Sequence, residues 1–498
     1  MLDSTRGAGG PAPAGGEQFG DPRYTFLVLD LETTALAEAR IPFRRELIAK
    51  YDRPGPRYTS YPTAPQFHTG FDAVDYATLL DESRAKPLPL SLYVHIPFCE
   101  QRCFFCGCNV AVTRNRERVE QYLERLRQEI EEVSLLAGGA ERQTIQVHWG
   151  GGTPTYLDPG QILDLMSWLR FTFPFAENCE ISVEVDPRHA SEEQLDALAE
   201  AGVNRLSMGI QDLDPEVQTA VNRRQPAELA WQVMTGARRR GIGSINVDLI
   251  YGLPYQTPAS FRATLEEVVR LSPDRLAVFN FAYLPSLFKH QRAIPAEALP
   301  SPETKLALLE ETMDVLGGAG YLLIGMDHFA KPGDPLARAL VEGTLTRNFQ
   351  GYATGGETDL LAFGASSISK VADGYAQNEK DLSAWDARLE IGELATCRGM
   401  VLSAEDLLRR EVILGILCHF GLEKQALAER WNLDFDRHFE RELAALEPLE
   451  ADGLIESTPH GFAVTPAGRP LVRNVAMCFD AYLGRSASGT APQYSRTV

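Results

Sequence analysis

The sequence predicts an α/β fold: a partial (β/α)6-type barrel with an N-terminal arm and a mainly helical, winged-helix-like C-terminal domain. Three observations support this prediction. The chain has 498 residues, 44% of them hydrophobic and 23% charged, which is typical of a globular protein of about three domain-equivalents. Short β-branched segments alternate with longer helical patterns between residues 92 and 281. Glycine and polar residues suited to chemistry follow these short segments.

Residues 1–46 are expected to form a variable, partly disordered extension. The first 20 residues are rich in Gly, Ala and Pro and contain no apolar run, so they resemble neither a signal peptide nor a membrane anchor. Residues 26–34 (FLVLDLETT) look like the opening motif of two-metal exonucleases. Nothing before Cys99 continues that motif, and we interpret the segment as a short surface element.

Residues 47–90 are expected to form an arm over the active site. Within it, residues 53–62 contain three prolines, two arginines and two tyrosines, a composition that excludes a helix and favours an extended chain. Such a segment can lie over the mouth of a pocket.

Residues 91–380 are expected to form the barrel domain. The predicted strands are residues 92–96, 145–149, 181–185, 205–210, 245–250 and 276–281. Helical patterns lie between them, for example at 118–136 and at 191–201, where Ser191 is a candidate N-cap followed by two glutamates. Strands that alternate with helices indicate parallel βα units, whose reactive groups gather at the C-terminal strand ends.

Residues 381–498 are expected to form the helical C-terminal domain. Ser403 caps a helical pattern with an acidic first turn, and residues 454–464 predict a β-hairpin. This combination resembles a winged-helix module, which commonly binds DNA. Residues 401–498 contain 10 basic and 14 acidic residues, a net charge of −4 that argues against DNA and favours a lid or packing role.

The charge of the whole chain points the same way. It carries 48 basic and 68 acidic residues, a net charge of −20, which opposes a broad electrostatic grip on nucleic acid or an anionic membrane. We expect a soluble cytoplasmic protein with no nucleic-acid or membrane partner. A locally basic pocket remains compatible with this composition.

Four of the eight cysteines, Cys99, Cys103, Cys106 and Cys108, fall within ten residues. In a cytoplasmic protein such a group usually holds metal or does chemistry. Three thiolates on one loop can bind three irons of a 4Fe-4S cluster and leave the fourth iron open. The alternative is a zinc site with Cys108 as the fourth ligand, although the single residue between Cys106 and Cys108 is awkward for joint chelation.

Aromatic residues next to these cysteines, Phe98, Phe104 and Phe105, suit a dry redox centre. The other four cysteines, Cys179, Cys397, Cys418 and Cys478, stand alone in apolar contexts and are interpreted as core residues.

A C-x3-C-x2-C motif with an aromatic before its third cysteine, at the start of a βα barrel, resembles the radical S-adenosylmethionine (SAM) superfamily. Longer segments are more specific: residues 58–64 (YTSYPTA), 92–99 (LYVHIPFC), 106–109 (CGCN), 148–156 (HWGGGTPTY), 325–330 (GMDHFA), 347–352 (RNFQGY) and 473–480 (RNVAMCFD). Together they closely resemble the oxygen-independent coproporphyrinogen III oxidase family, from about Leu47 to the C-terminal end.

This resemblance implies an oxidoreductase of haem and porphyrin biosynthesis. It would convert two propionate side chains of coproporphyrinogen III to vinyl groups, giving protoporphyrinogen IX, through a 5′-deoxyadenosyl radical made from SAM at a 4Fe-4S cluster. Cys99, Cys103 and Cys106 are the expected iron ligands, with SAM on the open iron. The expected partners are the substrate and a flavodoxin- or ferredoxin-type electron donor, and a monomer is expected.

The resemblance also implies two SAM molecules. The expected contacts of the first are Tyr93, Gly151, Glu184 and Ile368, and those of the second are Phe105, Gly152, Thr153, Gln211, Arg223, Asp248 and Ala282. The glycines at 150–152 let the backbone approach a ligand closely, and Gly107 is also expected to bind a cofactor. Many superfamily members have Glu where Thr153 stands, and Gln211 or Asp248 could instead cap or line the barrel. Glu184 and Cys108 are the expected catalytic residues, with Cys108 near the cluster but not ligating it.

The substrate carries four propionates, so its pocket needs cations. Arg53, Arg57, Arg223 and Arg347 are candidates because glycine, proline or aromatic residues accompany them. Tyr58 and Tyr61 could close over the substrate or serve in packing, and His328 could be a core or a catalytic residue.

Two alternative functions are considered. The haem chaperone paralogue shares the cluster motif and the barrel, but the pair Gly107–Cys108 and the segment 325–330 favour the oxidase. A non-enzymatic metal or electron-transfer protein would have no use for a rim rich in glycine and carboxylates.

Overall fold

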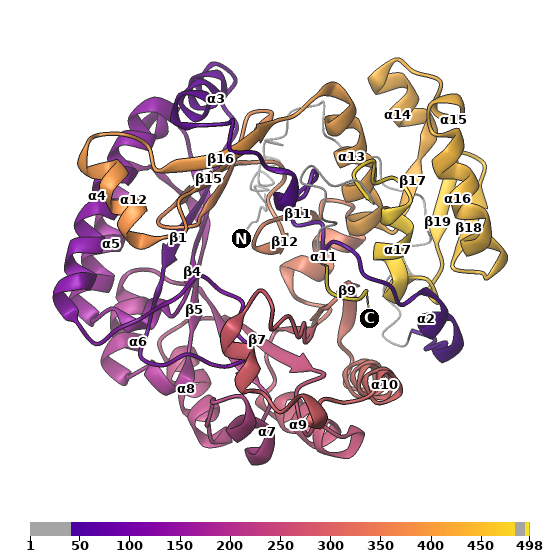
Figure 1. Ribbon diagram of the computed structural model, residues 1–498, viewed down its shortest axis with the longest axis horizontal. Coiled ribbons are helices and arrows are strands. Elements are labelled where there is room, and N and C mark those ends of the chain that lie inside the picture. The colour runs from indigo at the N-terminus through magenta and orange to yellow at the C-terminus, as the bar shows by residue number, and fades with distance from the viewer. Residues whose placement is uncertain (1–40, 484–493, 498) are drawn as a thin grey trace, which may run out of the picture.

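A computed structural model describes residues 41–483 and 494–497, so the exonuclease-like segment at 26–34 lies outside the described residues. Its central feature is a curved 12-stranded sheet with the order β16-β15-β14-β13-β1-β4-β5-β6-β7-β8-β10-β9. Helices cover the outer side of this sheet, and the C-terminal helices lie on the opposite side of the molecule (Figure 1). The site therefore has to be sought inside the curve of the sheet.

The six predicted strands form the parallel centre of the sheet and confirm the barrel. They are β1 (Leu90–Ile96), β4 (Thr144–Gly151), β5 (Phe175–Val185), β6 (Arg205–Gln211), β7 (Ser244–Tyr251) and β8 (Arg275–Asn280). The helices that connect them are α4 (Arg116–Ala137), α5 (Pro159–Thr172), α6 (Glu192–Glu200), α7 (Pro215–Ala220), α8 (Ala227–Arg239) and α9 (Pro258–Leu271). Parallel strands joined by helices place all their C-terminal ends at one rim.

Local sequence signals explain where these helices begin and end. The Ser191 hydroxyl accepts from the backbone N–H of Gln194, and the Gln194 side chain accepts from the backbone N–H of Ser191, which completes a capping box at the start of α6. Asn115 caps α4, and Gly138 ends α4 in the left-handed conformation that glycine adopts at low cost. Both predicted helices are thus confirmed within a few residues.

Further strands extend the barrel sheet on both sides, and the sequence had not indicated them. β13 (Asp359–Phe363) pairs parallel with β1, followed by antiparallel β14 (Ile368–Val371), β15 (Gly374–Asn378) and β16 (Thr396–Val401). Beyond β8 lie antiparallel β10 (His328–Ala330) and β9 (Leu322–Gly325). A separate hairpin is made by β11 (Thr346–Asn348) and β12 (Gly351–Ala353), and β2 (Phe98–Cys99) pairs with β3 (Ala111–Val112).

The remaining helices are placed around this framework. α10 (Pro302–Gly318) packs against α9, α11 (Pro335–Val341) contacts β9, and α12 (Leu382–Glu390) contacts α4. The bounds of the four predicted domains stay predictions. Because β16 belongs to the barrel sheet, the chain returns to the barrel after residue 381 before the C-terminal helices begin.

The C-terminal part confirms a mainly helical domain with a small wing. Its helices are α13 (Ala404–His419), α14 (Lys424–Trp431), α15 (Phe435–His438), α16 (Glu440–Ala451) and α17 (Val472–Met477). The predicted hairpin is β18 (Ile455–Thr458) and β19 (Gly461–Val464), joined by β17 (Gly421–Glu423). Ser403 caps α13 through a capping box with Asp406, as expected.

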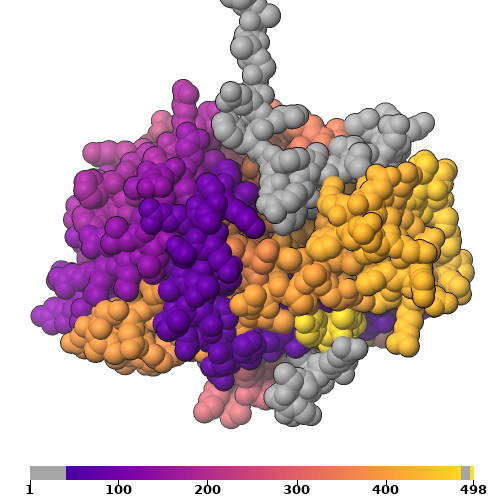
Figure 2. Space-filling model, turned by 90° about the horizontal axis from the view of Figure 1, so that it is seen from above, coloured from indigo at the N-terminus to yellow at the C-terminus, as the bar shows by residue number. Residues whose placement is uncertain are grey.

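The arm contains α2 (Arg45–Tyr51), an extended stretch and α3 (Ala73–Ala85). On the face shown in Figure 2, its indigo residues lie between the magenta barrel helices and the orange to yellow C-terminal half. Tyr58 and Tyr61 of the extended stretch are buried in a core shared with the C-terminal helices. Within the described residues, no helix is long and apolar enough to cross a membrane.

Candidate active site

A cavity of about 650 Å³ opens inside the barrel. All four residues expected at the first SAM, Tyr93, Gly151, Glu184 and Ile368, line it. Gly107, Cys108 and Asp248 line the same cavity. Residues up to 275 positions apart in the chain are therefore brought to one site, as the resemblance implied.

Donors or cations contact the sulfurs of all three clustered cysteines, while burial raises the pKa of Cys99 to about 11. Cys99 Sγ lies 3.4 Å from the hydroxyl of Thr153, and the backbone N–H of Cys108 points at Cys106 Sγ over 3.4 Å. Two guanidiniums, from Arg188 and Arg223, lie 3.5 and 3.6 Å from Cys103 Sγ. Donors and cations near sulfur stabilise its anionic form, the form that binds iron. The hydrogen bond with Cys108 also lowers the pKa of Cys106.

Cys108 itself is exposed to the cavity and touches the cluster loop through its backbone, which suits a residue beside the metal. In the chain from 41 to 483 and 494 to 497, no three His, Cys, Asp or Glu side chains are placed to share one metal ion.

Asp186, directly after β5, holds both guanidiniums in place. Its Oδ2 accepts hydrogen bonds from Arg188 Nη2 at 2.7 Å and from Arg223 Nη1 at 2.9 Å. Burial would raise the pKa of Asp186, but the guanidiniums of Arg223 and Arg188 bring it well below its ordinary value. This ionised carboxylate thus offsets part of the positive charge beside Cys103.

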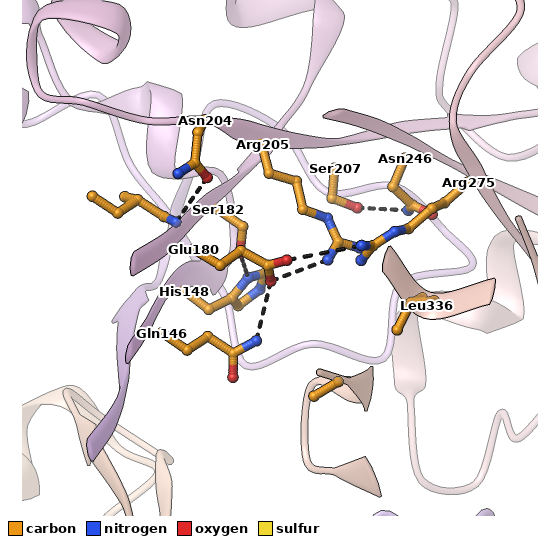
Figure 3. A network of polar contacts seen from close by, with 12 residues as sticks. Gln146, His148, Glu180, Ser182, Asn204, Arg205, Ser207, Asn246, Arg275 and Leu336 are labelled. Atoms are coloured by element: carbon orange, nitrogen blue, oxygen red, sulfur yellow. Dashed lines mark hydrogen bonds and ion pairs between the residues drawn. The ribbon is translucent and has the colours of Figure 1, made fainter. Parts of the chain in front are cut away.

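Glu184 is held at the cavity wall by two donors. Gly151 N–H donates to Oε2 at 3.1 Å, and His148 Nε2 lies 3.3 Å from Oε1. The other ring nitrogen of His148 lies 2.5 Å from the hydroxyl of Ser182 (Figure 3). The His148 ring also stacks on Tyr93, with centroids 5.8 Å apart and planes at 16°. One histidine therefore contacts two expected SAM-binding side chains.

A second histidine links Tyr93 to the cluster loop. His95 Nε2 lies 3.0 Å from the carbonyl of Asn109, and its Nδ1 lies 3.0 Å from the hydroxyl of Tyr93. Because a carbonyl can only accept, Nε2 carries the proton and Nδ1 accepts from Tyr93. Burial lowers the pKa of His95 and favours this neutral form.

Sequence reasoning missed His95 and His148, although a signal existed. Alternate residues of a strand share one face, so His95 faces the interior with Tyr93, and Ser182 does so with Glu184. Polar residues at alternate positions of buried strands indicate a polar barrel lining.

The glycines after β4 are needed for the packing of the protein itself. Gly151 has a φ of +121°, and a Cβ there would lie 2.7 Å from the His95 ring. A Cβ on Gly152 would lie 2.7 Å from the backbone of Pro97. A side chain at either position would therefore collide with residues that precede Cys99, whereas the Gly151 backbone also lines the cavity.

Of the residues expected at a second SAM, Asp248 lines the cavity. It accepts hydrogen bonds from Asn246 and Ser207, and burial, with a smaller effect of Glu184, raises its pKa to about 6.

The other residues expected at the second SAM lie around the cysteine loop, with Thr153 beside Cys99 and Arg223 beside Cys103. Gln291 donates to the carbonyls of both Phe105 and Ala282, and the amide of Gln211 lies beside Gly209, whose carbonyl accepts from Arg223.

The arginines expected to bind propionates have other contacts. Arg57 pairs with Asp327 and lies over the Phe279 ring at 5.2 Å. Arg347 donates to the carbonyls of Arg57 and Tyr58, both at 3.2 Å, and Arg223 pairs with Asp186. Arg53 is exposed. Among the described residues, none of these four lines the cavity, whose arginines are Arg205 and Arg275.

The structure also places the two tyrosines and the histidine whose roles the sequence left open. The hydroxyl of Tyr58 donates to Asp480 at 2.9 Å, and Tyr61 accepts from the backbone of Ala481, so both tyrosines pack the arm against the C-terminal part. His328 lines the cavity, and burial lowers its pKa to about 3, so its imidazole is neutral at pH 7.

Comparison with known proteins fits this geometry. The model of the Radical SAM superfamily matches residues 93–268, and that of the HemN C-terminal domain matches residues 402–471. Oxygen-independent coproporphyrinogen III oxidase of Salmonella typhimurium is 49% identical over 463 residues, covering 93% of this chain and all of that relative. The Escherichia coli K12 relative of the same name is 49% identical over 452 residues, covering 91% of this chain and 98% of the relative.

A solved structure from Escherichia coli, described as coproporphyrinogen III oxidase (HemN) and a radical SAM enzyme, has a TM-score of 0.85 and 48% identity. It matches 89% of this chain and 100% of its own. By identity, coverage and fold, the chain belongs to the oxygen-independent coproporphyrinogen III oxidase family, within the radical SAM superfamily.

Proposed function

We propose that this protein catalyses the oxygen-independent oxidative decarboxylation of two propionate side chains of coproporphyrinogen III to vinyl groups, giving protoporphyrinogen IX. The observation that carries this proposal is the meeting of Tyr93, Gly151, Glu184 and Ile368 in one cavity beside the cysteine loop. The full-length relatives bear the name of this reaction and support it. No observation favours the haem chaperone or an electron-transfer protein.

The radical SAM fold supports a 4Fe-4S cluster and SAM as cofactors. We assign the iron ligands to Cys99, Cys103 and Cys106, because backbone N–H, hydroxyl and guanidinium groups surround their sulfurs. When bound, these cofactors supply the radical chemistry that removes a hydrogen atom from an unactivated propionate carbon.

The protein's own groups orient the reactants. Glu184, fixed by Gly151 and His148, presents a carboxylate that can accept hydrogen bonds from ribose hydroxyls or from an ammonium group. Tyr93, fixed by His95, forms the neighbouring wall. Cys108 lines the cavity next to Cys106 and is proposed to act near the cluster without ligating it.

The two-SAM arrangement is part of this proposal. Its support is the placement of Thr153, Arg223, Phe105 and Ala282 around the cysteine loop and of Asp248 in the cavity. A flavodoxin- or ferredoxin-type donor, a monomeric state and a cytoplasmic location are proposed from the sequence resemblance and the acidic composition.

Anaerobic reconstitution tests the function. The protein should bind iron and sulfide in equal amounts, and with SAM, a reductant and coproporphyrinogen III it should form protoporphyrinogen IX. Cys106→Ala should lose both properties, whereas Cys478→Ala, at a half-buried cysteine far along the chain, should keep them. Zinc without sulfide, or 5′-deoxyadenosine without protoporphyrinogen, would contradict the proposal.

A further inference from the structure

Two arginines lie at the floor of the barrel cavity. Arg205 and Arg275 are the first residues of β6 and β8, so they lie at the N-terminal strand ends, opposite the rim that carries the cysteine loop. Both line the cavity, and no lysine is found among the described residues that line it. Figure 3 shows their guanidinium groups side by side, facing Glu180. An anionic group that enters this cavity can therefore meet these two cations.

Both guanidiniums have hydrogen-bonding capacity that the protein does not use. Arg205 Nη1 donates to Glu180 Oε1 at 3.2 Å, and Arg275 Nε donates to the two oxygens of Asp334 at 2.8 and 2.9 Å. Arg205 Nε and Arg275 Nη1 are buried without a hydrogen-bond partner, and Arg275 as a whole is only 2% exposed. A buried guanidinium N–H left without an acceptor is costly, but both atoms are closed off from solvent, so a ligand in the cavity reaches this pair through the Arg205 side chain, which is 17% exposed.

The floor is rigid because its carboxylates are fixed from other elements. Glu180 also accepts from Gln146 Nε2 at 3.1 Å and lies 3.8 Å from Arg275 Nη2. Asp334 caps α11 through the backbone N–H of Leu336. The two arginines and two carboxylates form a preassembled group whose geometry does not depend on a ligand.

The distance to the rim suits a large ligand. Glu184 pairs with Ser207, two residues beyond Arg205 on β6, which corresponds to about 7 Å along the strand. The cavity continues past Glu184 to Gly107 and Cys108. A ligand with carboxylates around a broad ring can thus present one of them at the rim and another at the floor.

We propose that Arg205 and Arg275 form a carboxylate-binding subsite at the barrel floor, which holds a propionate of the substrate that is not reacting. This inference rests on the proposed function, whose substrate carries four propionates. A guanidinium binds a carboxylate through two parallel N–H donors, so the subsite would fix the ring and select which propionate reaches the rim. Glu180 competes with the ligand for Arg205, so removing the charge of Glu180 should increase the affinity for the ligand.

The test measures equilibrium binding of coproporphyrin III, the stable oxidised form with four propionates, by fluorescence. A porphyrin with two propionates serves as a second probe. Arg205→Gln should weaken binding of the four-propionate probe about tenfold, as expected for the loss of a charged hydrogen bond, and should affect the two-propionate probe less. Arg205→Lys should fall between wild type and Arg205→Gln, because it keeps the charge but not the paired donors.

Glu180→Gln separates this subsite from a structural role. Removing the competing carboxylate should tighten binding of the four-propionate probe severalfold, although it breaks an ion pair. A purely structural pair would instead lose both stability and affinity. Arg262→Gln is the matched control, because Arg262 also pairs with carboxylates, those of Glu266, Glu311 and Asp314, but on the outer surface.

The outcomes distinguish this inference from the proposed function. Unchanged binding and unchanged substrate KM in Arg205→Gln, or weaker binding in Glu180→Gln, would overturn the subsite while activity stands. Porphyrin binding that follows the expected order without any turnover would support the subsite and contradict the proposed reaction. If Arg205→Gln fails to fold, the Arg205→Lys and Glu180→Gln variants decide, and a wild type that does not bind coproporphyrin III overturns the inference.

Discussion

His148 contacts three residues of the cavity wall. It stacks on Tyr93 and lies within hydrogen-bond distance of Glu184 and Ser182. His148→Phe keeps an aromatic ring on Tyr93 but removes both polar contacts, so Glu184 loses a donor that fixes its orientation. We expect SAM affinity to fall about tenfold, the size of one lost charged hydrogen bond. Equilibrium binding of SAM to the reconstituted protein measures this change.

Two further variants make the result specific. His148→Gln can still donate to Glu184 and should recover part of the affinity, whereas His460→Gln, at an exposed position of the C-terminal wing, should bind SAM like wild type. Equal affinities of His148→Phe and wild type would show that Glu184 keeps its orientation without the imidazole.

The predictability of single residues depended on how local their partners are. Cys99, Cys103 and Cys106 could be proposed as iron ligands because they follow one another on one loop with the spacing of the motif. The roles of His95 and His148 could not, because their partners, Asn109 and Ser182, come from other segments of the chain. Arg205 and Arg275 escaped notice for the same reason, since only the closed barrel places them together.

At the scale of elements, the βα units were predictable and the added strands were not. Each unit carries its own periodicity and caps, such as the capping box at Ser191. β13 joins β1 in parallel after more than 250 residues, and no helix separates β13, β14 and β15 from one another to indicate a further βα unit. Besides its backbone pairing with β1, β13 is held by a buried contact between distant residues, which the sequence pattern does not reveal.

That contact is the ion pair of Arg142 and Asp359, with side chains only 3% and 1% exposed. Asp359 also accepts from Ser83 at 2.8 Å and from the backbone of Ala372 at 3.0 Å. Asp359→Asn leaves the Arg142 guanidinium buried without a counter-charge, so we expect a loss of about 3 kcal/mol in the free energy of unfolding. Chemical denaturation measures it.

An exposed pair provides the comparison for this loss. Arg388 and Glu393 have side chains that are 44% and 50% exposed, and Glu393→Gln should change the free energy of unfolding far less. Similar losses in the two variants would mean that Arg142 finds another partner when Asp359 is neutral.

Glu129 on α4 should make the stability of the protein depend on pH. It is buried, accepts from the backbone N–H of Gly364 at 2.7 Å and from Asn378, and has Glu132 as a like-charged neighbour. Burial raises its pKa to about 7, against an ordinary 4.5. The folded state therefore binds more protons than the unfolded state between these values, so this residue's contribution to stability decreases as pH rises from about 4.5 to 7.

The variant Glu129→Gln removes this titration. The decrease in melting temperature between pH 5 and pH 8 should be smaller in Glu129→Gln than in wild type, and Glu124→Gln, at an exposed position of the same helix, should keep the wild-type decrease. A pH dependence that is unchanged in Glu129→Gln would show that the ionised carboxylate is not destabilising.

At the scale of the whole molecule, the arm, the barrel edge and the C-terminal helices share one hydrophobic core. Its members include Ile48 and Tyr61 of the arm, Ile324 of β9, and Val412 and Val475 of the C-terminal helices. Burial of apolar surface across all three parts couples their stability. Residues 47–61 of the arm therefore form a structural strap over the junction between the barrel and the C-terminal part, and the placement of the arm over the active site stays a prediction.

Arg347 fastens this strap from the barrel side. It is 8% exposed, lies 4.6 Å over the Tyr352 ring, and donates to the carbonyls of Arg57 and Tyr58, which no other described group replaces. Arg347→Ala removes both hydrogen bonds and the contact with Tyr352, while Tyr58 and Tyr61 keep their apolar contacts in the shared hydrophobic core. We expect the arm to open locally more often, because the free energy of local opening depends on the bonds broken. Limited proteolysis should cut residues 52–62 faster in Arg347→Ala than in wild type, at an unchanged global melting transition.

Arg347→Lys keeps the charge but not the paired donors, so it should behave like Arg347→Ala if the carbonyl contacts hold the arm. Cleavage rates equal to wild type in both variants would place the strength of the strap entirely in the packing of Tyr58 and Tyr61.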